Sequence, residues 1–461
     1  EADGQDIRAC QINCADVSEI RIPEASLRDH RLNGVSSFEI GSHNYALRPR
    51  PGVGLALDIG TTTVAAALWY LPSGRCLAQG SVANEQRRYG DNVLARIDHA
   101  VTLGGTGAPL QSALVEGSLQ PLIDSLCAKA QIETSAITEG IAAGNTVMLH
   151  SLAGARLSGF AAYPFRPQFI EAQALTSADL GFTTEFPLTL APNLGPFVGA
   201  DIALGALAAG MPEQIGPSLL IDFGTNGEIL LKTRDGYFAT ATAAGPAFEG
   251  GRLNCGAPAG AGVISSIGFE RDAWSIRHTG GQTEARSTGI SGGAYVDFIK
   301  HAVASGLLNE MGRLDPGHPM VDSLTTEEGT DKRVKIHQQQ YISETDVAEL
   351  IQAKAAIAAG VMTLLEEAGL QAEDLQTLYI AGGFGYHLNS THAMAIGMIP
   401  TVAAEKVRVI GNASLGGASL MLQTNSAATV ERLRSQCRII ELNQIDRFED
   451  HFIDCMPLRK I

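Results

Sequence analysis

The sequence predicts an α/β protein made of two similar lobes, each of which opens with a β-hairpin. The prediction rests on a pattern that occurs twice, LALDIGTTT around Asp58 and LLIDFGTNG around Asp222. Each copy reads as an apolar strand, an aspartate, a Gly-Thr turn and a second apolar strand. The two aspartates are 164 residues apart. That separation is far longer than the period of a solenoid, so two lobes are expected rather than a repeat array.

Composition limits the class of protein. Of the 461 residues, 45% are hydrophobic and 18% are charged, as in globular proteins. The net charge of −16 argues against nucleic-acid binding, which relies on Lys and Arg. The N-terminal sequence EADGQDIRAC does not read as a signal peptide, and no apolar run predicts a membrane span. Seven scattered cysteines do not suggest a disulfide framework, so a cytoplasmic setting is predicted.

Three segments are expected along the chain. Residues 1–50 read as polar and irregular, with one strand-like run, and end near the turn sequence RPRPG. Residues 51–205 are expected to form lobe I, and residues 206–461 are expected to form lobe II. The strands and helices predicted for lobe I lie within 54–83, 90–101, 119–132 and 139–154. Those predicted for lobe II lie within 219–243, 344–370, 377–389 and 406–423.

The two Gly-Thr turns are predicted to bind phosphate. Glycine lets the backbone approach a ligand, and successive turn N–H groups form a concavity that binds anions. The carboxylates of Asp58 and Asp222 can hold Mg²⁺, which prefers oxygen ligands, and both are candidate catalytic residues. In the structural alternative, both aspartates only end their strands. The candidate turn residues are Gly60, Thr61, Thr62, Thr63, Gly224, Thr225, Asn226 and Gly227.

A third glycine turn follows a late strand in YIAGGFGYHLN. A Gly-Gly turn allows close packing against a planar base or a ribose. After two phosphate hairpins it indicates nucleotide binding, although a plain tight turn is the alternative. The candidate residues are Gly382, Gly383, Phe384 and Gly385.

Several polar residues have two interpretations each. Asn145, a candidate catalytic residue, either positions water or caps the next helix. Glu228 is either a ligand of metal or water or a surface carboxylate. Glu249 and Gly250 either line the nucleotide site or form a turn.

The remaining candidates are interpreted as structural. Lys354 is expected on the solvent face of its helix, and His150 and His387 lack the spacing of metal ligands. The sequence GISGGAYVDFIK, which contains Ser291, is expected to open a helix, with either a packing turn or an anion site at its start. Buried, small structural cysteines are expected at Cys76, Cys127, Cys255, Cys437 and Cys455.

The order of the motifs resembles the ATP-dependent reductive activators of corrinoid-dependent enzymes, within the actin/hexokinase/Hsp70 superfamily. The resemblance covers about residues 7–461. It is carried by NEQRRYGDNVLARI, AAGNTVMLH, DFGTNGE, GPAFEGG, AGGFGYHLN and GNASLGGA. It implies a two-lobed actin-like ATPase with duplicated ribonuclease H-like lobes that bind ATP or ADP and Mg²⁺ between them.

The resemblance also implies the reaction and the partner. The reaction is the reduction of Co(II) to Co(I) in a corrinoid protein, such as a methyltransferase or a methionine synthase. Homodimer formation is suggested by the family alone. Neither nucleic acid nor a membrane is expected as a partner.

Cys10 in RACQI resembles the fourth ligand of a 2Fe–2S ferredoxin-like domain near that domain's end. Four thiolates are needed for such a cluster, and Cys10 and Cys14 alone cannot provide them. Residues 1–50 are therefore expected to be the remnant of this domain plus a linker, with the cluster present only in the full-length protein. About 35 residues separate Cys14 from PGVGL, so the extra middle domain of some relatives is expected to be absent.

Two other functions remain open. A small-molecule kinase of the same superfamily would need a carboxylate to deprotonate a hydroxyl, and Asp201 is a candidate. A nucleotide-dependent scaffold or filament protein would instead polymerise when ATP is added.

Overall fold

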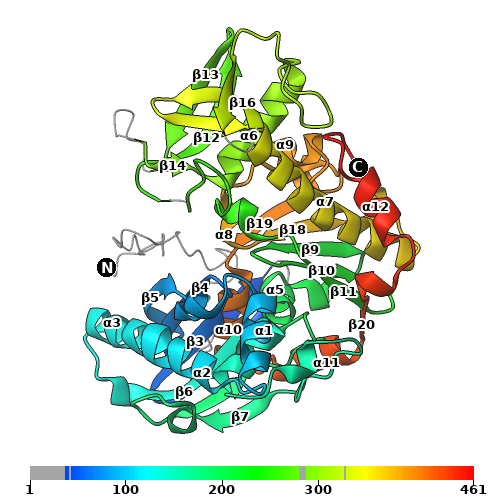
Figure 1. The fold of residues 1–461 in the computed structure, drawn as a ribbon. Helices are drawn as coiled ribbons and strands as arrows, with labels where there is room; N and C mark the ends of the chain where they lie inside the picture. Colours follow the sequence, from blue (N-terminus) through cyan, green and yellow to red (C-terminus); the bar gives the residue numbers. More distant parts are fainter. Residues whose placement is uncertain (1–36, 41–42, 259, 280–286, 327–328) are drawn as a thin grey trace, which may run out of the picture.

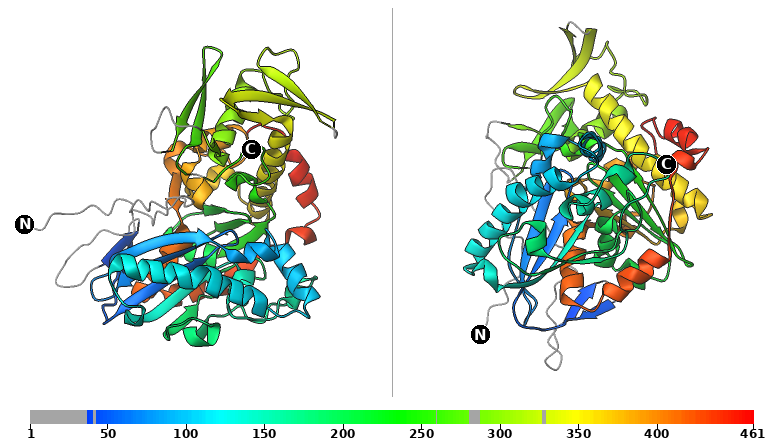
Figure 2. Two further views of the ribbon diagram at one scale, coloured as in Figure 1. Left: turned by 60° about the vertical axis from the view of Figure 1, so that its left-hand side comes forward. Right: turned by 60° about the horizontal axis from the view of Figure 1, so that its bottom comes forward.

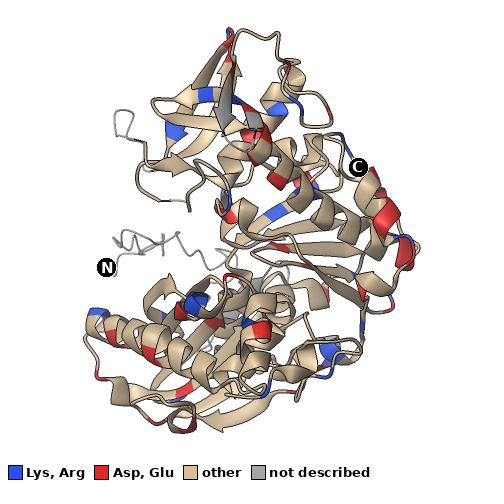
Figure 3. Cartoon of the chain, in the orientation of Figure 1, with Lys and Arg blue, Asp and Glu red and all other residues tan. Residues whose placement is uncertain are grey.

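The computed structural model describes residues 37–40, 43–258, 260–279, 287–326 and 329–461. Two six-stranded sheets dominate the fold, and each belongs to one lobe (Figure 1). Acidic residues outnumber basic ones by 49 to 33, and they lie over both lobes (Figure 3). Cys10 and Cys14 lie outside the described residues, so the prediction of a cluster ligand is not tested.

The first sheet has the strand order β5-β4-β3-β6-β8-β7. Its strands are β3 (Val53–Ile59), β4 (Thr63–Tyr70), β5 (Arg75–Ala83), β6 (Ile137–Gly144), β7 (Gln173–Thr176) and β8 (Pro187–Leu190). The first three strands form an antiparallel meander, and β6 and β8 continue the sheet in parallel beside β3. A parallel neighbour requires a long crossover connection, and the helices before β6 supply it.

The second sheet has the order β19-β18-β9-β10-β11-β20. Its strands are β9 (Ser218–Phe223), β10 (Gly227–Lys232), β11 (Tyr237–Thr242), β18 (Thr377–Ala381), β19 (Val407–Gly411) and β20 (Cys437–Ile439). Again a meander of three strands is followed by two parallel strands beside its first strand. The expected duplication of α/β lobes is confirmed, and β3 and β9 occupy equivalent positions.

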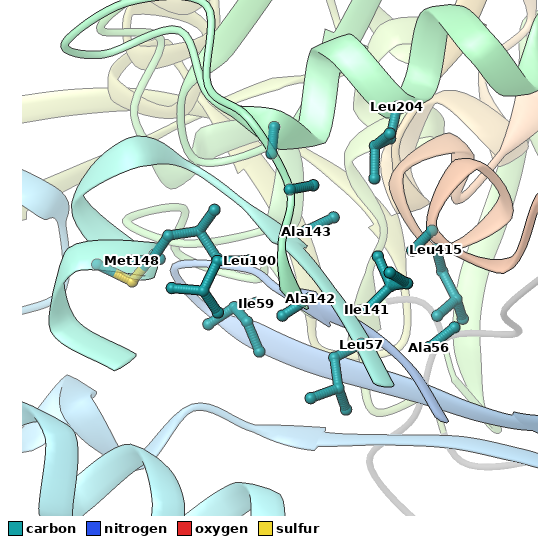
Figure 4. Close-up of a cluster of buried hydrophobic side chains, with 14 of the residues drawn as sticks. Ala56, Leu57, Ile59, Ile141, Ala142, Ala143, Met148, Leu190, Leu204 and Leu415 are labelled. Carbon is teal, nitrogen blue, oxygen red and sulfur yellow. The ribbon is translucent and has the colours of Figure 1, made fainter. Parts of the chain in front are cut away.

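Helices cover both faces of the first sheet. Those from the first half of the chain are α1 (Val93–Thr102), α2 (Ala108–Leu114), α3 (Gln120–Ala130), α4 (Thr146–Leu152) and α5 (Ala200–Ala208). Two helices come from the second half, α10 (Ala413–Gln423) and α11 (Ala427–Ser435). Figure 4 shows Leu415 of α10 beside Ala56, Ile141 and Leu204 in the core of the first lobe. The chain therefore returns to lobe I near its end. As a result, the two physical lobes do not coincide with the predicted division into residues 51–205 and 206–461.

The longest helix, α7 (Glu344–Glu367), lies in the core of the second lobe against β10 and β11. By length and composition it could cross a membrane, but 78% of its apolar window is buried inside the protein. The expectation that Lys354 faces solvent is wrong. This side chain is 1% exposed, and its Nζ donates to the carbonyl oxygen of Pro457 over 2.7 Å. Burial lowers the pKa of Lys354 to about 8.

A smaller unit stands at the end of the molecule opposite the first sheet (Figures 1 and 2). It has two three-stranded sheets and α6 (Gly292–Ala304), which starts at the cap Ser291. Its strands are β12 (Val263–Glu270), β13 (Ala273–His278), β14 (Gly289–Ile290), β15 (Val321–Thr326), β16 (Gly329–His337) and β17 (Gln340–Ser343). No sequence pattern predicted these sheets.

The segment expected to be irregular before lobe I contains a short antiparallel hairpin. It consists of β1 (Ser37–Ile40) and β2 (His43–Ala46), and Leu47 then bridges to Thr424 near α11. The expectation of irregular structure up to residue 50 is therefore wrong for this part. The segment after this hairpin therefore contacts the region between α10 and α11.

Candidate functional site

The two predicted phosphate turns meet directly. The Oγ1 atoms of Thr62 and Thr225 lie 2.7 Å apart, although one residue belongs to the β3–β4 hairpin and the other to the β9–β10 hairpin. Asp58 is the penultimate residue of β3, and Asp222 holds the same place in β9. The fold therefore brings both copies of the repeated motif to one place.

The first turn is tightly constrained. A Cβ atom on Gly60 would lie 2.3 Å from the carbonyl oxygen of Thr63, so only glycine fits there. Thr61 is buried, whereas Thr62 and Thr63 are exposed. The exposed Thr62 directs its hydroxyl toward Thr225 of the second turn.

Asp58 is held by the N-terminus of α10. Ser414 Oγ donates to Asp58 Oδ1 over 2.7 Å, and Asn412 Nδ2 donates to Asp58 Oδ2 over 2.8 Å. Burial raises the pKa of Asp58, while these two hydrogen bonds favour its charged form and oppose that rise. Both partners lie in the segment GNASLGGA, which contributed to the resemblance, but nothing in the sequence paired them with Asp58.

Asp222 and Asp201 lie near Asp58 and repel it. Burial raises the pKa of Asp222 to about 8, and the charges of Asp201, Asp58 and Glu249 add to this rise. Burial also raises the pKa of Asp201, at the start of α5, to about 7. The sequence suggests Asp201 only as the base of a kinase. The structure places it in the same acidic group as the two repeated aspartates.

Glu228 and Asn145 connect the two lobes below the turns. Asn145 Oδ1 accepts from the N–H of Val147, so the helix-cap interpretation is confirmed. Its Nδ2 also lies 3.4 Å from Glu228 Oε1. Glu228 is 6% exposed, which excludes the surface interpretation. Burial, with the charges of Asp201 and Asp222, raises the pKa of Glu228 well above its ordinary value.

Glu249 joins the same group from a short 3-10 helix, Pro246–Glu249, that ends at Gly250 in the left-handed region with φ of 83°. Its Oε2 accepts from Thr225 Oγ1 over 2.9 Å. Burial raises the pKa of Glu249, and hydrogen bonds from Thr225 and Thr62 oppose the rise. The turn interpretation of Glu249 is confirmed, and its contact with Thr225 places it beside the two hairpins. Its role in a nucleotide site stays a prediction.

Among the residues that the structure describes, the group of five carboxyls has no Lys or Arg partner. In the described ranges, no Lys or Arg forms an ion pair with any of Asp58, Asp201, Asp222, Glu228 and Glu249. The same part of the chain has no cluster of three or more His, Cys, Asp or Glu arranged as a complete metal site.

The third glycine turn lies beside Asp222. A Cβ atom on Gly382, whose φ is 89°, would come within 2.7 Å of Asp222 Oδ1 and 2.3 Å of the carbonyl oxygen of Phe223. Gly383 starts α8 (Gly383–His387). The Phe384 ring is only 8% exposed and stacks on Phe248 with a centroid distance of 4.9 Å. Because this ring belongs to the core, the predicted contact of Phe384 with a nucleotide would have to come from its backbone.

Sequence reasoning missed the support beneath the first turn. Asn84 Nδ2 donates to the carbonyl oxygen of Gly60 over 2.9 Å, and Arg96 Nη2 donates to that of Thr61 over 2.6 Å. Both residues lie in NEQRRYGDNVLARI, which had been used only for the resemblance. The structure buries both polar side chains beside the glycine turn. The sequence alone contains no pattern that pairs them with that turn.

The remaining candidates stay structural. His150 is buried, its Nδ1 contacts the carbonyl oxygen of Thr146 at 2.8 Å, and burial lowers its pKa to about 4. The side chain of His387 is not among those described. Cys127 and Cys455 are buried as expected, whereas Cys76, Cys255 and Cys437 are half-buried. Cys127, Cys255, Cys437 and Cys455 carry free thiols.

Family models match almost the whole described chain. Residues 216–460 match the model described as the C-terminal domain of RACo, the ASKHA domain. Residues 53–214 match the RACo middle region. The middle region coincides with the segment predicted as lobe I. The further domain of some relatives would precede residue 51, and its expected absence stays a prediction.

Two curated relatives have related names. Corrinoid activation enzyme RamQ of Eubacterium limosum is 32% identical over 398 residues, which cover 83% of this chain and 66% of RamQ. The Co(II) methylated amine-specific corrinoid protein reductase of Methanosarcina barkeri is 25% identical, with 78% of this chain and 68% of the reductase covered. The chain thus spans just under two thirds of RamQ.

A solved structure agrees with these matches. The reductive activator for corrinoid, iron-sulfur protein superposes with a TM-score of 0.79 at 29% identity, covering 92% of this chain and 70% of that chain. The predicted actin-like ATPase fold is confirmed by this similarity and by the ASKHA match. Since the C-terminal model alone matches more than half of the residues, the chain belongs to the RACo family, of which it contains the middle region and the C-terminal ASKHA domain.

Proposed function

We propose that this chain is the nucleotide-binding part of an ATP-dependent reductive activator, which drives the reduction of a corrinoid protein from Co(II) to Co(I). The observation that carries the proposal is the contact between Thr62 and Thr225, which brings two phosphate turns and two strand-end aspartates together. Family membership supplies the reaction, since curated relatives are named for corrinoid activation and for the reduction of a corrinoid protein. The target is a corrinoid methyltransferase component or a methionine synthase.

In this proposal the triphosphate of ATP lies between the two hairpin turns. The turn N–H groups and the hydroxyls of Thr62, Thr63 and Thr225 bind the phosphate oxygens. Asp58 and Asp222 would hold Mg²⁺, and Gly382 and Gly383 would allow the nucleoside to approach β18. When bound, Mg²⁺ neutralises charge on the phosphate oxygens.

The same geometry supports hydrolysis. Asn145 is fixed by its cap to α4, and its Nδ2 contacts Glu228. A water held by this pair can lose its proton to Glu228 when that carboxyl is ionised, whereas burial beside Asp201 and Asp222 raises its pKa and favours the protonated form. ATP and water then give ADP and phosphate. Hydrolysis can drive the complex with the corrinoid protein only through a difference in affinity between its states.

The reduction itself transfers one electron to cobalt. The donor we infer is a low-potential 2Fe–2S cluster, to which Cys10 would contribute one thiolate. For a one-electron step, each ~59 mV uphill lowers the equilibrium constant tenfold, so a gap of a few hundred mV needs coupled free energy. Free cysteines in the described chain are consistent with a cytoplasmic location, and a homodimer remains a family-based proposal.

The first experiment is isothermal titration of this chain with ADP and with a non-hydrolysable ATP analogue in the presence of Mg²⁺. We expect micromolar binding that Asp222→Ala abolishes. Asp235→Ala, in an exposed turn of the same sheet, is the matched control and should bind like the wild type. Absence of binding to the wild type would overturn the nucleotide site.

The second experiment measures Co(I) by its absorbance. A Co(II) corrinoid protein is mixed with the full-length activator, a low-potential reductant and ATP, with or without Asp222→Ala. ATP-dependent formation of Co(I), lost in the variant, supports the proposal. ATP-independent reduction would contradict it.

One observation supports a kinase alternative. Asp201 has a pKa of about 7, which would suit deprotonation of a hydroxyl acceptor. Phosphate release from γ-labelled ATP, measured with and without a panel of sugars, separates the two functions. Label found on a sugar would favour the kinase, whereas label found only as free phosphate favours the activator.

A further inference from the structure

Arg96 of α1 lies directly beneath the first phosphate turn and is fully buried, with no exposed surface. Its guanidinium donates four hydrogen bonds, three to oxygen atoms and one from Nη1 to Met148 Sδ over 3.3 Å. Nη2 donates to the carbonyl oxygen of Thr61 over 2.6 Å, Nε to that of Gly90 over 2.9 Å, and Nη1 to Gln86 Oε1 over 3.1 Å. The planar fork is therefore fixed from three sides.

This buried cation has no carboxylate partner. Its acceptors are all neutral, and among the described residues Arg96 forms no ion pair. Burying an unpaired charge is costly, and such charges in proteins are usually paired. Burial lowers the pKa of Arg96 to about 10, with a small opposing effect from Asp91. An anion on the other side of the turn would offset this cost.

The turn itself indicates where that anion would bind. Three successive carbonyl oxygens are satisfied from beneath, since Gly60 O accepts from Asn84 Nδ2, Thr61 O from Arg96, and Thr62 O from the N–H of Asn84. In contrast, no described residue accepts a hydrogen bond from the N–H groups of Thr61 and Thr62. Free N–H groups opposite satisfied carbonyls form an anion-binding concavity.

We propose that Arg96 is a positioning residue for the polyphosphate: it fixes the carbonyl of Thr61 in the first turn and supplies positive charge from behind the turn to an acidic site. The inference rests on the proposed nucleotide function and deepens it. Its effect should grow with the charge of the ligand, because a charge behind the turn acts on phosphates and not on the nucleoside. A purely structural role would weaken all nucleotides alike.

The test compares Arg96→Lys with Arg96→Gln in titrations with ATP analogue, ADP and AMP. Lysine keeps the charge and loses the fork, whereas glutamine keeps one donor and loses the charge. We expect Arg96→Gln to weaken ATP-analogue binding by about tenfold or more, ADP binding less and AMP binding least, with partial rescue by lysine. Arg88→Gln, at an exposed position in the same segment, is the control and should bind normally.

A second variant covers the case in which the Arg96 variants do not fold. Gln86→Glu leaves Arg96 in place and gives it a carboxylate partner at the position of Gln86 Oε1, at the loss of the bond from Gln86 Nε2 to Leu110 O. Circular dichroism should show a folded protein, with ATP-analogue binding weakened more than AMP binding.

Equal losses for all three nucleotides, or wild-type affinity in Gln86→Glu, would overturn the inference while the nucleotide site stands. If the wild type binds none of the nucleotides, the proposed function fails instead. The two failures are therefore distinguishable.

Discussion

Ser414 Oγ donates a hydrogen bond to Asp58 Oδ1 over 2.7 Å, although the two residues are 356 positions apart in the sequence. The bond joins the first motif of the chain to a helix that forms near its end. Hydrogen bonds to a carboxylate favour its charged form, which is the form that binds a metal ion. The start of α10 therefore favours the charged form of Asp58, a residue in the opposite half of the sequence.

Ser414→Ala should weaken Mg²⁺-nucleotide binding and move its pH dependence upward. Loss of the donor raises the pKa of Asp58 further, so a higher pH is needed to form the carboxylate. At neutral pH we expect an affinity loss of roughly ten- to a hundredfold, from the net value of one hydrogen bond to a charged group. Titration calorimetry between pH 6 and 9 measures both effects.

Ser419→Ala is the control on the same helix, because its hydroxyl accepts from Trp69 Nε1 in the core and not from the site. It should lower the melting temperature without moving the pH profile. An unshifted profile in Ser414→Ala would show that this bond does not control Asp58.

Asp222→Asn should stabilise the protein at alkaline pH while removing nucleotide binding. The pKa of Asp222 is about 8 in the folded protein, against an ordinary value of 3.8. Between these values the folded state keeps a proton that the unfolded state has lost, so stability falls as the pH rises. Without Mg²⁺, the wild type should melt at a lower temperature at pH 8.5 than at pH 6.

An asparagine side chain at this position cannot ionise, so the melting temperature of the variant should change less with pH. At pH 8.5 the variant should melt at a higher temperature than the wild type. Differential scanning calorimetry at several pH values measures this. Asp235→Asn, at an exposed turn, should behave like the wild type. A lower melting temperature of Asp222→Asn at pH 8.5 would contradict the assignment of the raised pKa.

Thr225→Val should reduce ATP-analogue affinity by about tenfold, since one hydroxyl serves both Thr62 and Glu249. Valine has nearly the same shape, so the change removes the hydrogen bonds and little packing. Thr225→Ser keeps the hydroxyl and should retain most of the affinity. Equal binding by the valine and serine variants would show that the hydroxyl makes no contact with phosphate.

Gly382→Ala should destabilise the protein more than Gly306→Ala does. Both glycines have left-handed φ, of 89° and 77°, but a Cβ at Gly306 meets nothing within 4 Å. In the control, only the left-handed conformation is unfavourable, at about 1–2 kcal/mol. At Gly382 the methyl group also overlaps Phe223 O and Asp222 Oδ1, which we expect to add at least ~2 kcal/mol.

Urea denaturation measures the two free energies of unfolding. The Gly382 variant should in addition bind nucleotide poorly, because Asp222 must move. Equal destabilisation by the two changes would mean that the backbone near Gly382 adjusts freely.

Local patterns predicted the two hairpins, because an apolar strand, a Gly-Thr turn and a second strand are specified within a short stretch of sequence. The duplication then predicted that Asp58 and Asp222 are equivalent. The partners of Asp58 in α10 could not be predicted, since no local pattern encodes a contact over more than 350 residues. Lys354 was misjudged for a similar reason, because the carbonyl that accepts from it lies 103 residues away.

The returning helices α10 and α11 have a consequence for synthesis on the ribosome. The first sheet is translated early, but Trp69 meets Ser419 only after 350 further residues. Until then one apolar face of that sheet lacks its cover, and such exposed surfaces promote aggregation. The nascent first lobe should therefore depend on a chaperone, and a chain cut near residue 215 should be poorly soluble even though the cut falls between the two matched family regions.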